Sequence, residues 1–217
     1  MIDSNATTQA ALAEVRLVSV NVGVPREIGT RRGQPIRSGI VKQPVTADTL
    51  YLDFTNLEGD RQADLRVHGG PDKAVYAYPV EHLAVWNDEL GVQFGPGTFG
   101  ENLTTEGWLE SDVRIGDVWV WGDARMQVTQ PRQPCYKLAT ITGRPEIIKR
   151  LVANGRTGWY LRVLEPGRVP IGGPIRVVAR GAERQTILAV HRELTNWAGV
   201  DPPPVAVGVN AREWTGR

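Results

Sequence analysis

Short stretches of alternating or β-branched apolar residues recur along the chain and predict a fold rich in strands. The stretch at 15–24 partly alternates valine with polar residues, which favours a strand with one buried face. Similar patterns predict strands at 39–45, 50–57, 74–78, 118–121, 125–129, 158–164, 175–180 and 187–190. Glycine and proline clusters separate these stretches, so we expect many short strands joined by turns.

Apolar residues at helical spacing predict helices at 79–90 and 145–154, each opening on a proline and followed by a glycine. A shorter helix is expected at 138–142. Because strands outnumber helices and no linker or repeat divides the chain, we predict a mainly β fold, a closed β-barrel with a few short helices. The predicted organisation is a leader at 1–14, one barrel domain at 15–195 and a short proline-containing tail at 196–217.

Composition and charge narrow the classes of partner. Lysine plus arginine total 25 and aspartate plus glutamate 24, a balance that argues against a general nucleic-acid or membrane-surface binder. A single cysteine excludes an internal disulfide and every metal site built from several cysteines. No apolar stretch reaches transmembrane length, and the first residues lack the pattern of a signal peptide. We therefore expect a cytoplasmic protein with no nucleic-acid or membrane partner.

The single cysteine, Cys135, lies in a stiff loop between basic residues. Pro131 and Pro134 restrict the backbone before it, and Arg132 and Lys137 flank it. A nearby positive charge favours the thiolate, the form of cysteine that attacks substrates or binds metals. The alternative is a buried structural cysteine, because free cysteines are among the most buried residues.

A polar stretch at 59–71 has neither helical nor strand periodicity, and such segments inside compact domains are often functional. His68 precedes a Gly-Gly-Pro turn, where a ligand can approach the backbone closely. Basic residues bracket the stretch: Arg61, Arg66 and Lys73. The alternatives are a turn histidine bonded to backbone and a solvated basic face.

A third stretch, at 95–105, holds three glycines in six residues and ends with Glu101 and Asn102. The amide N–H groups of such a loop can point at an anion, although the stretch lacks the endings of the known nucleotide-binding loops. The alternative is a simple turn in which Asn102 caps a local element.

Taken in order, the segments 63–79, 97–103 and 130–135 resemble one family. The first contains Ala63-Asp64, His68-Gly69-Gly70 and Lys73 to Pro79; the second reads Gly-Thr-Phe-Gly-Glu-Asn-Leu; the third reads Gln-Pro-Arg-Gln-Pro-Cys. Together they resemble the MOSC domain, named after the C-terminal domain of molybdenum cofactor sulfurase, in its small free-standing bacterial YiiM-like branch. The resemblance covers roughly 15–195. The tail after Leu194 does not resemble the three-helix C-terminal segment of that branch, so the contacts of that segment are not implied.

The resemblance implies a closed β-barrel with a pocket for the molybdenum cofactor, molybdopterin, in which Cys135 ligates molybdenum. We expect cofactor contacts from these stretches and from Arg61 just before the first of them, namely Arg61, Arg66, His68, Lys73, Thr98, Phe99, Gly100, Asn102, Arg132 and Cys135. Cations and loop amides of this set suit the cofactor's phosphate, and thiolate suits a soft metal.

Related members reduce N-hydroxylated compounds, such as 6-N-hydroxylaminopurine, to amines. For that activity we expect Cys135 at the metal, His68 or Glu101 as proton donor, and a separate electron-donor reductase as partner, because the sequence has no flavin or haem motif. The alternative is a carrier that holds the cofactor, or sulfur as a persulfide on Cys135, without turnover. A third hypothesis, a cysteine hydrolase with His68 as base, lacks an evident orienting residue or oxyanion hole. The sequence does not predict the oligomeric state.

Overall fold

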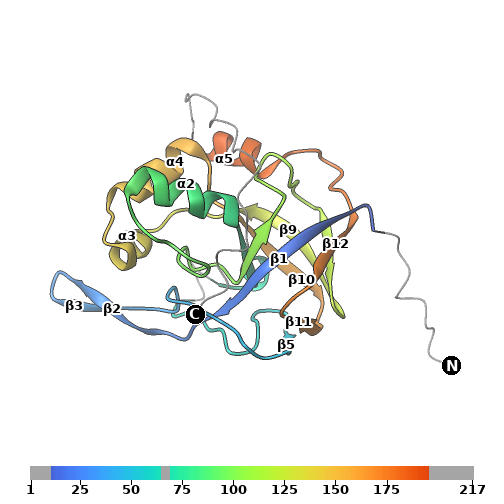
Figure 1. Ribbon diagram of the computed structural model, residues 1–217, viewed down its shortest axis with the longest axis horizontal. Coiled ribbons are helices and arrows are strands. Elements are labelled where there is room, and N and C mark those ends of the chain that lie inside the picture. Colours follow the sequence, from blue (N-terminus) through green and yellow to red (C-terminus); the bar gives the residue numbers. More distant parts are fainter. Residues whose placement is uncertain (1–10, 65–68, 196–217) are drawn as a thin grey trace.

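Seven strands form a closed barrel in the computed structural model, which describes residues 11–64 and 69–195 (Figure 1). The barrel strands are β1 (Ala13–Val22), β6 (Val75–Pro79), β7 (Leu103–Glu106), β8 (Val118–Trp121), β9 (Ala124–Pro131), β10 (Trp159–Glu165) and β12 (Pro174–Ala179). Their order is β12-β8-β9-β10-β6-β7-β1, and pairing of β1 with β12 closes the ring. All pairs are antiparallel except β6 with β7, which are parallel. The predicted closed β-barrel is confirmed.

Alternating side chains of the strands fill the barrel interior. In β9 the residues Ala124, Met126 and Val128 are buried while their neighbours are partly exposed. Trp119 and Trp159 pack edge to face inside, with ring centroids 5.9 Å apart. This period of two is the pattern from which the strands were predicted.

Two small sheets and a short pair lie outside the barrel ring. β2 (Arg26–Arg31) and β3 (Gln34–Ser38) form a hairpin, β5 (Thr49–Leu52) pairs with β11 (Gly167–Pro170), and β4 (Gln43–Pro44) extends β1. The sequence predicted no strand over 26–38, because the hairpin has few apolar residues to alternate. β7 and β11 were also missed, since both are four residues long and lie beside turn-forming residues.

Four helices and one 3-10 turn complete the fold in the described ranges: α2 (Val80–Leu90), α3 (Tyr136–Thr142), α4 (Glu146–Asn154), α5 (Ile187–Thr195) and η1 (Pro71–Lys73). Figure 1 shows the four helices gathered on one side of the barrel. There Tyr78, Trp86, Phe99 and Leu138 form a second apolar core. None of the helices in the described ranges is long and apolar enough to cross a membrane.

Two predictions at the chain ends need correction. The strand predicted at 187–190 is wrong: these residues begin α5, with Ile187 and His191 buried one helical turn apart. Thr186 accepts a hydrogen bond from the Ala189 amide, a capping contact that favours a helix there. At the other end Ala13 already pairs in β1, so the strand begins inside the predicted leader. The predicted tail at 196–217 lies outside the described residues.

Candidate functional site

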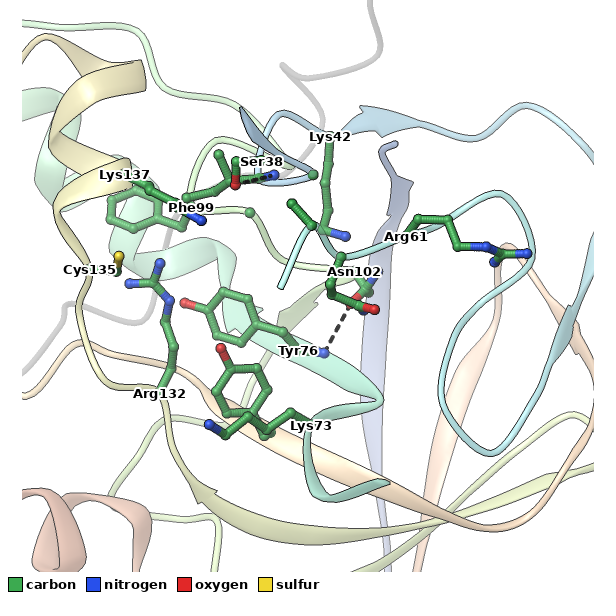
Figure 2. Close-up of a pocket in the computed structure, with 16 residues that line it drawn as sticks. Ser38, Lys42, Arg61, Lys73, Tyr76, Phe99, Asn102, Arg132, Cys135 and Lys137 are labelled. Carbon is green, nitrogen blue, oxygen red and sulfur yellow. Dashed lines mark hydrogen bonds between the residues drawn. The ribbon is translucent and has the colours of Figure 1, made fainter. Parts of the chain in front are cut away.

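A pocket beside Cys135 is built from segments far apart in the sequence (Figure 2). Its wall is formed by several segments: the end of β3, residues 61–63, η1, the start of β6, residues 99–102, strand β10, and the loop that follows β9. Five basic residues of the described ranges line it: Lys42, Arg61, Lys73, Arg132 and Lys137. Among the residues described for this pocket there is no aspartate or glutamate, so an anionic ligand suits its charge.

Cys135 lies where the chain leaves β9 and enters α3. Its backbone is extended, with φ −128° and ψ 144°, and its carbonyl accepts a hydrogen bond from the Leu138 amide at 2.9 Å. It is the residue just before the helix, and its side chain is partly exposed on the pocket wall. The structure therefore places the sulfur at an accessible site; the alternative of a fully buried structural cysteine does not hold.

Arg132 is the most buried cation of the pocket, with 5% of its surface exposed. Its amide donates to the Gly158 carbonyl at 3.2 Å, and its guanidinium lies 5.4 Å from the centroid of the Tyr76 ring. Burial alone would lower the pKa of Arg132, but Tyr76, Tyr160 and Cys135 outweigh it and raise that pKa. One guanidinium nitrogen, Nη1, has no hydrogen-bond partner among the described residues. A buried donor of this kind calls for an acceptor on a ligand.

Tyr76 and Tyr160 form the floor of the pocket, and the sequence analysis did not single them out. They are opposite each other on β6 and β10, with ring centroids 5.3 Å apart. The Tyr76 hydroxyl donates to the Thr157 carbonyl at 2.8 Å. Burial raises the pKa of Tyr160 although Arg132 opposes the shift, so the phenol is neutral near pH 7. Their pairing could have been found only from the register of two strands 80 residues apart.

Lys42 is a further pocket residue that the sequence did not reveal. It is buried and forms an ion pair with Asp60, which is fully buried and also accepts a hydrogen bond from the Gly23 amide at 2.8 Å. Burial lowers the pKa of Lys42, while Asp60 favours its charged form. The pair anchors the cation at the pocket wall.

In the glycine-rich loop that begins at Gly95, backbone amides donate hydrogen bonds to the carboxylate of Glu101, a residue of the same loop. Glu101 is fully buried and accepts hydrogen bonds from the Gly97 amide at 2.6 Å, the Phe99 amide at 3.0 Å and the Thr104 hydroxyl at 2.8 Å. The amides of Thr98 and Gly100 donate to carbonyls of the same loop. The prediction that these amides offer an anion cradle is therefore wrong, because all four already have acceptors. Burial raises the pKa of Glu101 to about 7.

Asn102 is a pocket residue whose amide holds three strands together. Its Oδ1 accepts from the Tyr76 amide at 3.1 Å, and its Nδ2 donates to the Asn21 carbonyl at 3.3 Å. Two residues before it, Gly100 has φ +79°, and a Cβ there would lie 2.7 Å from the Ile40 side chain. Only glycine lets these two segments of the wall approach so closely.

The model of the MOSC domain matches residues 64–176, which is more than half of the chain. The chain belongs to the MOSC domain family. It is 44% identical to "Uncharacterized protein YflK" of Bacillus subtilis over 81% of its own length and 79% of that protein. The crystal structure of YiiM from Geobacillus stearothermophilus is 35% identical and superposes with a TM-score of 0.69, covering 83% of this chain and 84% of that one. The small free-standing YiiM-like branch predicted from the sequence is confirmed.

A third relative is much longer. A protein of Gibberella moniliformis described as "Reductase" is 34% identical over 74% of this chain, but the match spans only 29% of that protein. The MOSC family is associated with the molybdenum cofactor, so the pocket has to be compared with that group.

The MOSC pocket gathers most of the residues predicted for cofactor contacts: Arg61, Lys73, Phe99, Gly100, Asn102, Arg132 and Cys135. Figure 2 shows the Arg61 guanidinium turned away from Cys135 and Arg132, and it donates to the Asp60 carbonyl at 2.7 Å. Thr98 and Glu101 do not line this pocket. Arg66 and His68 lie outside the described residues.

The residues present fit an anionic cofactor with a soft metal. The donor set offers one accessible thiol and several cations, and the Nη1 of Arg132 needs an acceptor. The described part of the chain contains no cluster of three or more metal-ligating His, Cys, Asp or Glu side chains. Among the described residues, Cys135 would therefore supply the protein ligand, and further ligands would come from the cofactor itself.

Proposed function

We propose that this MOSC protein is a reductase that holds the molybdenum cofactor and converts N-hydroxylated compounds, such as 6-N-hydroxylaminopurine, to amines. The observation that carries the proposal is the position of Cys135 beside the buried, incompletely hydrogen-bonded guanidinium of Arg132. A thiolate binds a soft metal, and a buried guanidinium binds phosphate or another oxyanion through paired N–H groups. The description of the Gibberella relative as a reductase agrees with this class of reaction.

The other basic residues have distinct tasks in this proposal. Lys137 lies two residues after Cys135 and lines the same pocket, so it adds positive charge beside the sulfur. Lys42 and Lys73 add positive charge to the wall where the cofactor's phosphate would bind. Lys42 is fixed by Asp60, which makes it a preorganised contact.

The reaction replaces an N–O bond by an N–H bond: the hydroxylamine takes up two electrons and two protons and releases water. The bound molybdenum supplies the two-electron chemistry. The chain supplies orientation and protons, and Tyr160 holds its proton at neutral pH inside the pocket because burial raises its pKa. His68 and Glu101 stay predicted proton donors; the Glu101 carboxylate lies behind the loop wall, held by three donors.

The second candidate is a carrier of cofactor or sulfur, and the exposure of Cys135 favours it. Cys135 lines the pocket and also an adjoining second hollow, together with Gln133 and Tyr136. A partly exposed sulfur that borders both hollows suits transfer to another protein as well as catalysis.

The test is expression of the full chain in a host that makes the cofactor, with a cofactor-deficient host as control. Molybdenum and pterin content are measured, followed by reduction of 6-N-hydroxylaminopurine with reduced methyl viologen as artificial donor. The proposal predicts about one molybdenum per chain and amine formation only with protein from the first host. Stable cofactor without turnover supports the cofactor carrier, and protein that binds no cofactor contradicts both the reductase and the cofactor carrier.

A further inference from the structure

The hairpin formed by β2 and β3 concentrates positive charge outside the pocket. Residues 26–37 contain four arginines, Arg26, Arg31, Arg32 and Arg37, and one acidic residue, Glu27. They carry a net charge of +3, whereas the whole chain carries +1, so the remainder carries a net −2. All four arginines are exposed, and within the described residues none of them takes part in an ion pair. This charge is therefore available to a partner.

The hairpin extends from the barrel as an arm on the side where α3 lies (Figure 1). The arm packs closely against α3 at this point: a Cβ added at Gly29 of β2 would lie only 3.3 Å from the Thr140 side chain of α3. The buried residues Ile36 and Ser38 fix the other strand, and Ser38 lines the pocket. The arm is thus joined to both the pocket wall and the helix that follows Cys135.

The turn of the hairpin presents an arginine at a position that favours other residues. Arg31 pairs with Gln34, which leaves Arg32 and Gly33 as a two-residue loop with φ values of +52° and +75°. Turns of this type favour asparagine or glycine at the first of these positions. The strained backbone at Arg32 holds a charged side chain at the outermost point of the arm.

The basic surface reaches directly to the Cys135 loop. The Arg31 guanidinium lies 4.5 Å from the ring centroid of Tyr136, the residue after Cys135. Arg31, Arg32 and Arg37 line a shallow hollow together with Tyr136 and Lys137, and Lys137 also lines the pocket. A protein bound to this surface would therefore lie beside the proposed metal site.

We propose that the β2–β3 arm is the docking surface for an acidic electron-carrier protein that delivers electrons to the Cys135 pocket. The inference rests on the proposed reductase function, in which two electrons must enter for each amine formed. Two reduced one-electron carriers are oxidised, the N–O bond breaks, and two protons from solvent complete the amine and water. A carrier with carboxylates around its redox group matches the arginines, and complementary charge accelerates such transient encounters.

A nucleic acid is the less suitable partner for this surface. Binding to single strands relies on aromatic faces on which bases stack. Tyr136 is the one aromatic side chain lining the described hollow, and Arg31 already covers its ring.

The test is a binding titration that does not require a loaded or active enzyme. The full chain is titrated at low salt with two acidic probes, an oxidised [2Fe–2S] ferredoxin and a flavodoxin, and with a DNA fragment. We compare the wild type, the double variant Arg32→Glu/Arg37→Glu, and Arg168→Glu, which reverses an exposed charge on β11, on the far side of the barrel. Neither Arg32 nor Arg37 lines the pocket, and circular dichroism checks that all three proteins are folded.

We expect at least one acidic carrier to bind the wild type, about 10-fold or more weaker binding by the double variant, and a change below about 2-fold for Arg168→Glu. High salt should weaken wild-type binding strongly. With loaded protein, the double variant should lose carrier-driven turnover and keep turnover with methyl viologen. Equal binding by the double variant, binding of neither carrier, or binding of DNA alone overturns the proposal. Loaded protein inactive with every donor would instead contradict the reductase function, while the titration still tests the surface.

Discussion

The guanidinium of Arg132 lies 5.4 Å from the centroid of the Tyr76 ring, and its Nη1 has no hydrogen-bond partner among the described residues. A charged group with 5% of its surface exposed normally has all its donors satisfied, because an unmet buried donor is costly. The face of an aromatic ring compensates this charge only in part. The acceptor that Nη1 of Arg132 lacks would therefore be supplied by a bound ligand.

Replacing Arg132 by methionine should separate ligand binding from folding. Arg132→Met removes the guanidinium and keeps most of its bulk, so the free energy of unfolding of the cofactor-free protein should stay the same or increase. Cofactor affinity should fall by about 1.5–3 kcal/mol, or roughly 10- to 150-fold, as one charge-assisted contact is lost. Urea unfolding and cofactor content after gel filtration measure the two effects.

The matched control for Arg132→Met is Lys149→Met, because Lys149 is an exposed cation on α4 outside the pocket. Lys149→Met should change neither the free energy of unfolding nor the cofactor content. Cofactor retention by Arg132→Met equal to that of the control would contradict the assignment of Arg132 as a ligand-binding group.

The buried ion pair of Lys42 and Asp60 should affect the free energy of unfolding strongly, in a way that depends on both partners being present. Asp60→Asn leaves a buried ammonium without its counter-ion and should lower the free energy of unfolding by about 3–5 kcal/mol. The double variant Asp60→Asn/Lys42→Met removes the uncompensated charge and should recover most of that loss. Urea unfolding of the three proteins tests this, and a loss below about 1 kcal/mol in Asp60→Asn would show that the pair is not buried in solution.

The raised pKa of Glu101 predicts that the free energy of unfolding falls as the pH rises. Burial raises its pKa from 4.5 to about 7, so the folded protein binds this proton more tightly than the unfolded chain. The stabilisation is fully present below about pH 4.5 and is lost as the pH rises through about 7. Across this interval the free energy of unfolding should fall by roughly 2–3 kcal/mol more in wild type than in Glu101→Gln, whose amide does not titrate. Parallel pH profiles of the two proteins would show that the Glu101 pKa is not raised.

The sequence predicted the barrel because its strands bury alternate side chains. β9 shows this directly, since Ala124, Met126 and Val128 are the buried members of a clean period of two. The β2–β3 hairpin was missed for the opposite reason: its strands are mostly exposed, and few apolar residues mark them. At 187–190 the β-branched residues suggested a strand, but Thr186 caps a helix whose buried face runs from Ile187 to His191.

The site was predicted to the extent that it depends on local motifs. Arg132 and Cys135 lie on one contiguous loop, so their proximity in the site could be predicted from the sequence. Lys42 and Tyr160 enter the pocket only through tertiary contacts, with Asp60 and across the β6–β10 register, which no local pattern encodes. Glu101 illustrates the converse, because a conspicuous acid in a glycine-rich motif serves to close its own loop.

The central claim is that Cys135 ligates molybdenum, and X-ray absorption at the molybdenum edge tests it most directly. The full chain and its Cys135→Ser variant are loaded in the same cofactor-producing host and compared at equal metal content. The small change in side-chain size should leave the fold unchanged, whereas a neutral hydroxyl is a far poorer ligand for this metal than thiolate. We predict one fewer molybdenum–sulfur contact in the variant, together with loss of 6-N-hydroxylaminopurine reduction. The same number of sulfur ligands in both proteins would contradict the account.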